Sequence, residues 1–316
     1  MIADPAPFHA DLAEGPEGGH AVWLRTADGV RIRLGLWPAG PKGRVLIFPG
    51  RTEYVEKYGP FASDLARAGY GAAAIDWRGQ GLADRLAPDP MLGHVGRFSD
   101  YQRDMAAVLA HLEATDGEAP RFLLAHSMGG CIGLRTLTAG PAGGLAVRAA
   151  AFSAPMWGIH FSPGMRPVAR GLALAARATR QGLRYAPGTG AQSHLATNSF
   201  AENALTRDPQ VYGWMQDHLA RQPALALGGP GLHWLGEALA ECRALEREPL
   251  PALAVLCLLG TAESIVDAQA VRRQVARWPT ARLQLLAGGE HELLMERAPL
   301  RDVAVAAIVD HFDSAG

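Results

Sequence analysis

Short runs of apolar residues alternate with helix-like segments along most of this chain. Two of these runs, 45–48 and 71–75, are continuous, and two more, 121–125 and 147–152, each include one arginine; all four end at turn or polar residues. Between them, 55–68 and 99–115 carry apolar side chains three or four positions apart, the spacing of one helix face. Short, wholly apolar strands are typical of a parallel sheet that helices cover on both faces. The pattern therefore predicts an α/β fold with a mostly parallel central sheet.

Residues 21–37 show a different pattern, in which apolar and polar side chains alternate on either side of Asp28-Gly29. Alternation around a tight turn predicts a β-hairpin, and therefore an antiparallel entry to the sheet. Further along, Ser99 and Gln102 have the spacing of a capping box. This spacing predicts a helix that continues to about residue 115.

The alternation stops between about 156 and 245, where short helical patterns mix with Pro-Gly turns and scattered aromatic residues. It then returns, in the order strand, helix, strand, helix, at 253–259, 268–277, 283–286 and 299–312. We therefore expect one core formed by residues 1–155 and 246–316. Residues 156–245 are expected to form a helical cap inserted into that core.

Composition excludes several classes of function. The 316 residues carry a net charge of −1 without a cluster of lysines and arginines, which argues against nucleic acid as a partner. The three cysteines are odd in number and scattered, so they predict no disulfide framework and suit a reducing compartment: Cys131, Cys242 and Cys257. No leader pattern begins the chain and no apolar run reaches about 18 residues. We expect a soluble, cytoplasmic protein.

Ser127 lies where the apolar run 121–125 meets a helical segment. A serine between small residues at a strand-to-helix turn is the pattern of a nucleophile elbow, in which the backbone is strained and its neighbours must be small. Gly129 fills one small position and Ala125 the other, so the motif is A-x-S-x-G, not the commoner G-x-S-x-G. The pattern predicts Ser127 as a nucleophile.

A serine nucleophile needs a base and an acid that orients it, and in this type of fold the chain order is serine, acid, histidine. His291 follows the last predicted strand and two glycines, so it is the candidate base. Glu263, four residues after the strand 253–259, is the preferred acid. Asp267 is the alternative acid, although its position also suits the N-cap of the helix that begins near 268.

The oxyanion formed by serine attack needs two hydrogen-bond donors. The backbone N–H of Met128, directly after the nucleophile, is one candidate. The other is the backbone N–H of Arg51, in the loop after the strand 45–48, where Gly50 permits close approach. Pro49-Gly50 is also consistent with an ordinary turn.

Two other motifs are incomplete, and we expect neither a cofactor nor a metal. Gly79-Gln80-Gly81 follows a strand, but Asp84 stands where a dinucleotide loop needs its third glycine. His291-Glu292 begins a zinc-binding H-E-x-x-H pattern, but Met295 occupies the second histidine position. We interpret His94 and His126 as packed or hydrogen-bonded residues.

Four segments carry a resemblance to a known family: 48–54 (FPGRTEY), 75–81 (IDWRGQG), 125–130 (AHSMGG) and 291–296 (HELLME). They resemble α/β-hydrolases of the monoacylglycerol lipase and lysophospholipase L2 type. In the cap, 203–208 and 227–235 resemble the lysophospholipase L2 branch, so the likeness spans the chain from about residue 20. The chain departs from the family in Pro49-Gly50, usually His-Gly, and in Glu263, an aspartate in many members.

The resemblance implies the α/β-hydrolase fold and a serine hydrolase in which Ser127, Glu263 and His291 cleave an acyl ester beneath the cap. The expected substrate is a lysophospholipid, a monoacylglycerol or another lipid-like ester. Two other functions suit the same residues: acyl transfer to an alcohol through the same intermediate, and ligand binding without catalysis. Acyl-chain length, head group, oligomeric state and peripheral membrane contact stay open.

Overall fold

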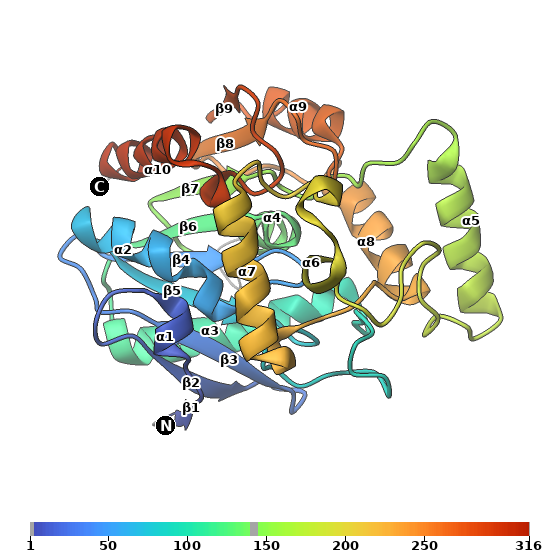
Figure 1. Cartoon of the computed structure of the whole chain (residues 1–316). Helices are drawn as coiled ribbons and strands as arrows, with labels where there is room; N and C mark the ends of the chain where they lie inside the picture. Colours follow the sequence, from blue (N-terminus) through green and yellow to red (C-terminus); the bar gives the residue numbers. More distant parts are fainter. Residues whose placement is uncertain (1–2, 140–144, 316) are drawn as a thin grey trace.

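The computed structural model describes residues 3–139 and 145–315, and a nine-stranded sheet forms its centre (Figure 1). The strand order is β1-β2-β3-β5-β4-β6-β7-β8-β9. The strands are β1 (Asp4–Ala6), β2 (His20–Arg25), β3 (Arg31–Leu36), β4 (Arg44–Phe48), β5 (Gly71–Asp76), β6 (Arg121–His126), β7 (Ala149–Ser153), β8 (Ala254–Gly260) and β9 (Ala281–Leu286). Pairing is antiparallel from β1 to β5 and parallel from β5 to β9 along this order. The mostly parallel sheet is confirmed.

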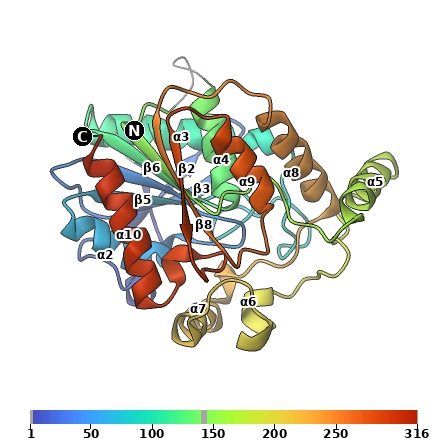
Figure 2. The same ribbon diagram turned by 90° about the horizontal axis from the view of Figure 1, so that it is seen from above.

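Helices cover both faces of the sheet, as Figure 2 shows from above. The α-helices are α1 (Ala10–Ala13), α2 (Gly59–Arg67), α3 (Tyr101–Asp116), α4 (Met128–Thr138), α5 (Met165–Ala178), α6 (His194–Thr197), α7 (Pro209–Arg221), α8 (Leu232–Leu245), α9 (Ala268–Ala276) and α10 (Ala298–Asp313). The 3-10 turns are η1 (Val55–Tyr58), η2 (Phe98–Asp100), η3 (Phe200–Glu202), η4 (Pro223–Leu225) and η5 (Leu293–Met295). The predicted strand and helix order of the core is confirmed.

Alternate residues of each central strand face opposite layers. In β4, Val45 and Ile47 pack with residues of α2 and α10, whereas Leu46 and Phe48 pack with residues of α3, α4 and α9. Successive side chains of a strand point to opposite faces, so a strand covered on both sides must be apolar throughout. This requirement explains why the core strands appear as unbroken apolar runs.

The predicted hairpin is present, with Val22 opposite Leu34 across the β2–β3 pair. Strand β1 was not predicted, because its three residues, two of them Asp4 and Pro5, carry no alternating apolar signal. It adds an antiparallel edge to β2.

The predicted capping box at Ser99 and Gln102 is wrong. Asp100, not Gln102, accepts a hydrogen bond from a backbone amide, that of Arg97, and the regular helix begins at Tyr101. The side chain of Gln102 instead contacts α4, where its amide donates to the carbonyl of Ile132. The carboxylate of Asp100 therefore accepts the capping hydrogen bond that was predicted for the side-chain amide of Gln102.

Residues 156–245 contain α5 to α8 and separate β7 from β8. Of these helices, α8 packs on the core, because its inner face joins the same apolar cluster as α3 and α4. Helix α5 is outermost and packs its alanines on α8 (Figures 1 and 2). The limits of the cap and of the two core segments stay predictions, and those segments include residues 1–2, 140–144 and 316, outside the described residues.

All three cysteines are buried and free. Within residues 3–139 and 145–315, no helix has both the length and the apolar composition that crossing a membrane requires.

Candidate active site

Ser127 lies in the turn between β6 and α4, with a backbone φ of 49° and ψ of −119°. A non-glycine residue at positive φ is strained, and such strain gathers at active sites. The turn is crowded: a Cβ placed on Gly129 would lie 2.0 Å from the Phe48 carbonyl oxygen. The extra methyl of Ala125 is accommodated because it faces Gly133, whose own added Cβ would lie 3.2 Å from that methyl.

The structure brings Ser127, His291 and Glu263 into one hydrogen-bonded chain. His291 follows β9, and its Nε2 lies 2.8 Å from the Ser127 Oγ. Its Nδ1 lies 2.7 Å from Oε2 of Glu263, which follows β8. A neutral imidazole with its proton on Nδ1 donates to Glu263 and accepts from the serine hydroxyl. This is the geometry of a nucleophile, base and orienting acid.

The Glu263 carboxylate is held ionised. Burial would raise its pKa, but hydrogen bonds from His291 and from two backbone amides hold that pKa below its ordinary value. The amides are those of Ile265 and Val266, which donate to Oε1 at 2.6 and 3.0 Å. The loop after β8 therefore fixes one oxygen and leaves the other for His291.

Asp267, the alternative acid, does not join this chain. Its Oδ1 accepts from the amides of Gln269 and Ala270 at the start of α9, and its Oδ2 pairs with Arg166. Asp267 is therefore an N-cap residue, the other interpretation that its position allowed.

The loop after β4 lies directly against Ser127. A Cβ on Gly50 would lie 3.0 Å from the Ser127 Cβ, so only glycine fits without a shift. The Gln80 amide donates to the Gly50 carbonyl at 2.8 Å, and the Trp77 indole donates to the Pro49 carbonyl at 3.0 Å. The loop is thus held in place by two side chains of the turn that follows β5.

The two predicted oxyanion donors lie on either side of Ser127, the candidate nucleophile. Met128 begins α4, and Arg51 follows Gly50 in the pinned loop. Among the described residues, neither backbone N–H donates to a protein acceptor. Two unused amides beside a nucleophilic oxygen are what an oxyanion hole requires.

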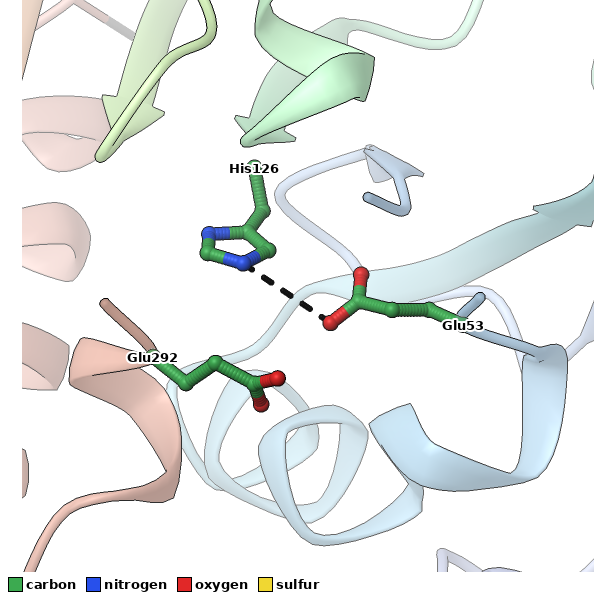
Figure 3. A group of neighbouring side chains, drawn as sticks. All are labelled: Glu53, His126 and Glu292. Atoms are coloured by element: carbon green, nitrogen blue, oxygen red, sulfur yellow. Dashed lines mark ion pairs between the residues drawn. The ribbon is translucent and has the colours of Figure 1, made fainter. Parts of the chain in front are cut away.

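A buried charged cluster, which the sequence patterns did not reveal, lies behind the nucleophile: Glu53, His126 and Glu292, drawn in Figure 3, with Lys57 between the two carboxylates. The Lys57 ammonium lies 2.6 Å from Oε1 of Glu53 and also bonds Glu292. Carboxylates and an imidazole are metal-ligand types, but a protein cation already occupies the position between the carboxylates. Lys57 therefore neutralises the two carboxylates of this cluster without a metal ion.

This cluster supports both halves of the site. Glu53 accepts a hydrogen bond from the Gly50 amide, which orients the loop that carries Arg51. Burial would raise the pKa of Glu53, but Lys57 and His126 lower it to about 2. The His126 ring lies 4.8 Å from the His291 ring, centroid to centroid, and its pKa is lowered by burial. The only sequence signal was the i, i+4 spacing of Glu53 and Lys57.

A cavity of about 320 Å³ opens over Ser127 and His291. The core contributes its floor, and residues 193–205, Tyr212 and residues 227–228 contribute its other walls. These wall segments come from the stretch predicted as a cap. Ser127 therefore faces a partly covered cavity.

The chain is similar to known proteins in sequence and in fold. Residues 39–298 match the Hydrolase_4 family, described as serine aminopeptidase, S33. Lysophospholipase L2 of Escherichia coli K12 is 35% identical over 295 residues, which cover 90% of this chain and 85% of that protein.

Two solved structures show the same fold at 19% identity. A soluble variant of monoglyceride lipase from Saccharomyces cerevisiae, in complex with a substrate analog, has a TM-score of 0.71 and covers 92% of this chain and 94% of its own. Monoacylglycerol lipase from Paleococcus ferrophilus has a TM-score of 0.70, with 90% and 99% covered.

Proposed function

This chain belongs to the serine aminopeptidase S33 family of α/β-hydrolases and is a carboxylic ester hydrolase, and on that basis we propose that it cleaves lysophospholipids or monoacylglycerols through an acyl-enzyme on Ser127. The observation that carries the proposal is the Ser127–His291–Glu263 chain of hydrogen bonds at 2.8 and 2.7 Å, at the floor of the cavity.

In the first half-reaction, the Ser127 Oγ attacks the ester carbonyl while His291 Nε2 takes the hydroxyl proton. The carbonyl oxygen becomes an oxyanion and accepts hydrogen bonds from the amides of Met128 and Arg51, each of which contributes about 3–4 kcal/mol in a working site. Glu263 stabilises the imidazolium without taking its proton. When the tetrahedral intermediate collapses, His291 protonates the departing alcohol and the acyl group stays on Ser127.

In the second half-reaction, water attacks the acyl-enzyme. His291 takes a proton from the water and returns it to the Ser127 Oγ as the fatty acid leaves. An alcohol in place of water would give acyl transfer by the same steps. The two functions therefore differ only in the acceptor.

Lipid-like esters are the proposed substrates for two reasons. The cavity is partly covered by the segment that we propose as the cap, residues 156–245, and a covered cavity suits the acyl chain of a lipid ester. Relatives named lysophospholipase L2 and structural neighbours named monoglyceride lipase support the same class. We also propose a cytoplasmic location, because three buried free thiols suit a reducing compartment.

The test is product analysis by mass spectrometry. Protein is incubated with a lysophospholipid and a 1-monoacylglycerol of the same acyl chain, with and without added glycerol, and the Ser127→Ala variant is the blank. We expect free fatty acid as the main product from at least one substrate. Turnover of p-nitrophenyl esters without turnover of either lipid would overturn the proposed substrate class, and acylated glycerol as the main product would replace hydrolysis with acyl transfer.

A further inference from the structure

Arg51 is a cation in the cavity without a counter-ion. Its guanidinium lies between Gly228 and Trp234, and Arg51, which is half-buried, lines the cavity over Ser127. Among the described residues, no carboxylate forms an ion pair with its guanidinium, and the nearby titratable group is the Tyr101 phenol. A buried charge without a partner is costly, so its retention in a cavity wall points to an anion that arrives with the ligand.

The guanidinium has donors to spare. One of its nitrogens donates to the Gly228 carbonyl at 2.9 Å, and the group lies 5.7 Å from the centroid of the Trp234 ring. These contacts hold the planar group in place through one N–H bond and a cation–π contact, and an arginine has five N–H donors. Burial lowers the pKa of Arg51 to about 10, so the group stays charged at neutral pH.

The other cation of the cavity wall is already neutralised. Lys57 lies between Glu53 and Glu292 and bonds both. Within the described part of the cavity wall, Arg51 is therefore the cation that remains for an anionic ligand.

We propose that the Arg51 guanidinium binds the phosphate of a lysophospholipid head group and so selects phosphorylated over neutral glycerol esters. The inference rests on the proposed function, in which the Arg51 backbone amide holds the ester oxyanion. The amide and guanidinium of one residue are a side-chain length apart, and in a lysophospholipid only the glycerol backbone separates ester from phosphate. A guanidinium also matches the phosphate oxygens in pairs, which a point charge does not.

Arg85 provides a matched control. It too joins the core to the cap through carbonyl oxygens alone, those of Gly79, Gly81, Ala224 and Ala226. Its side chain is not part of the described cavity wall. Loss of Arg85 therefore tests the structural tie without removing a charge from the cavity.

The experiment measures one ratio, kcat/KM for a lysophosphatidylglycerol divided by kcat/KM for the 1-monoacylglycerol with the same acyl chain, both below micelle formation. The ratio cancels any general effect of a substitution on the oxyanion loop. In Arg51→Met we expect it to fall by about tenfold or more, the effect of one lost charge-assisted contact, with Arg51→Lys intermediate and Arg85→Met unchanged.

An unchanged ratio in Arg51→Met, or an equal fall in Arg85→Met, would overturn the inference and leave the proposed function intact. Wild-type protein that cleaves only the monoacylglycerol would also overturn it. Cleavage of neither lipid would overturn the proposed function itself. A further outcome separates the head group from free phosphate. If inorganic phosphate inhibits monoacylglycerol cleavage, Arg51→Met abolishes that inhibition and the ratio stays unchanged, then Arg51 binds free phosphate and the head-group assignment is overturned.

Discussion

At the scale of single residues, the choice between two carboxylates shows what spacing alone leaves undecided. Glu263 and Asp267 both follow β8, and each is close enough to the end of that strand to be a candidate acid for His291. Their roles separate only when the chain folds: the loop amides fix one oxygen of Glu263 beside His291, and α9 takes Asp267 as its cap. A cap and a catalytic acid can use the same residue types.

The paired variants Glu263→Gln and Asp267→Asn test this assignment. Glutamine no longer favours the required tautomer or stabilises the imidazolium, so we expect kcat to fall by about 10³–10⁴-fold. Asparagine keeps the cap, so Asp267→Asn should retain wild-type kcat and lose at most about 1 kcal/mol of stability with the Arg166 pair. Steady-state kinetics and urea unfolding measure both. The reverse ranking of the two variants would assign the acid to Asp267.

The local patterns predicted Ser127 and His291 because each comes soon after a core strand, Ser127 directly after β6 and His291 in the loop after β9, where position in the chain predicts position in space. The cluster of Glu53, Lys57 and Glu292 had no such signal. Its defining contact joins residues 57 and 292, which only the folded chain brings together. Local residue spacing does not predict long-range pairing of this kind.

At the scale of elements, the β6–α4 turn explains why the motif around Ser127 needs a glycine at its last position and tolerates an alanine at its first. Gly129 is required because the β4 backbone passes over it, whereas the first small position needs only to be small enough to face Gly133. Alanine meets that condition. The A-x-S-x-G form is therefore accommodated in this fold.

We predict opposite outcomes for two substitutions in this turn. Gly129→Ala would place its Cβ 2.0 Å from the Phe48 carbonyl oxygen, so it should cost about 3 kcal/mol and abolish turnover. Ala125→Gly should keep kcat and cost about 1 kcal/mol or less, through backbone entropy. Urea unfolding and p-nitrophenyl ester turnover measure these effects. A fully active Gly129→Ala protein would show that the turn is not this tight.

We expect helix α7 to be destabilised by acid through His218. The ring is buried between Tyr54 of the core and Trp214, with centroids at 5.8 and 4.1 Å, and burial lowers its pKa from 6.5 to about 4. The unfolded chain therefore binds this proton more readily than the folded chain. The resulting stability is complete above pH 6.5 and is lost as the pH falls towards 4.

The variant His218→Phe should remove this part of the acid sensitivity, worth on the order of 1 kcal/mol near pH 5 after screening. The measurement is Tm between pH 8 and pH 5 for the wild type and for His218→Phe, with the exposed His160→Phe as control. We expect a smaller acid shift only in His218→Phe. Equal shifts in all three proteins would exclude His218 as the cause.

At the scale of the whole molecule, the core was predictable and the cap was not. Core strands are covered on both faces and so must be apolar throughout, which the sequence displays directly. In the cap, packing in the folded chain decides which helices face the cavity and which face solvent. The sequence did not show that α8 would join the core cluster or that α5 would lie outermost.

This arrangement predicts uneven protection when the site is filled. Residues 193–205 line the cavity, whereas α5 contacts α8 on the far side. In hydrogen–deuterium exchange, a covalently bound long-chain phosphonate should slow exchange in 193–205 and leave α5 unchanged. Equal protection of both segments, or of neither, would contradict the proposed placement of the acyl chain beneath this part of the cap.

Every step of the proposed mechanism depends on Ser127 as the nucleophile, and intact-mass spectrometry after reaction with a fluorophosphonate tests this role most directly. The Oγ displaces fluoride and retains the phosphonyl group, so the wild type should gain one adduct, mapped to the peptide that contains Ser127. Ser193→Ala, which removes another serine of the cavity wall, should label like the wild type. Ser127→Ala should neither label nor turn over ester substrates, and labelling or turnover at the wild-type rate in Ser127→Ala would contradict the mechanism.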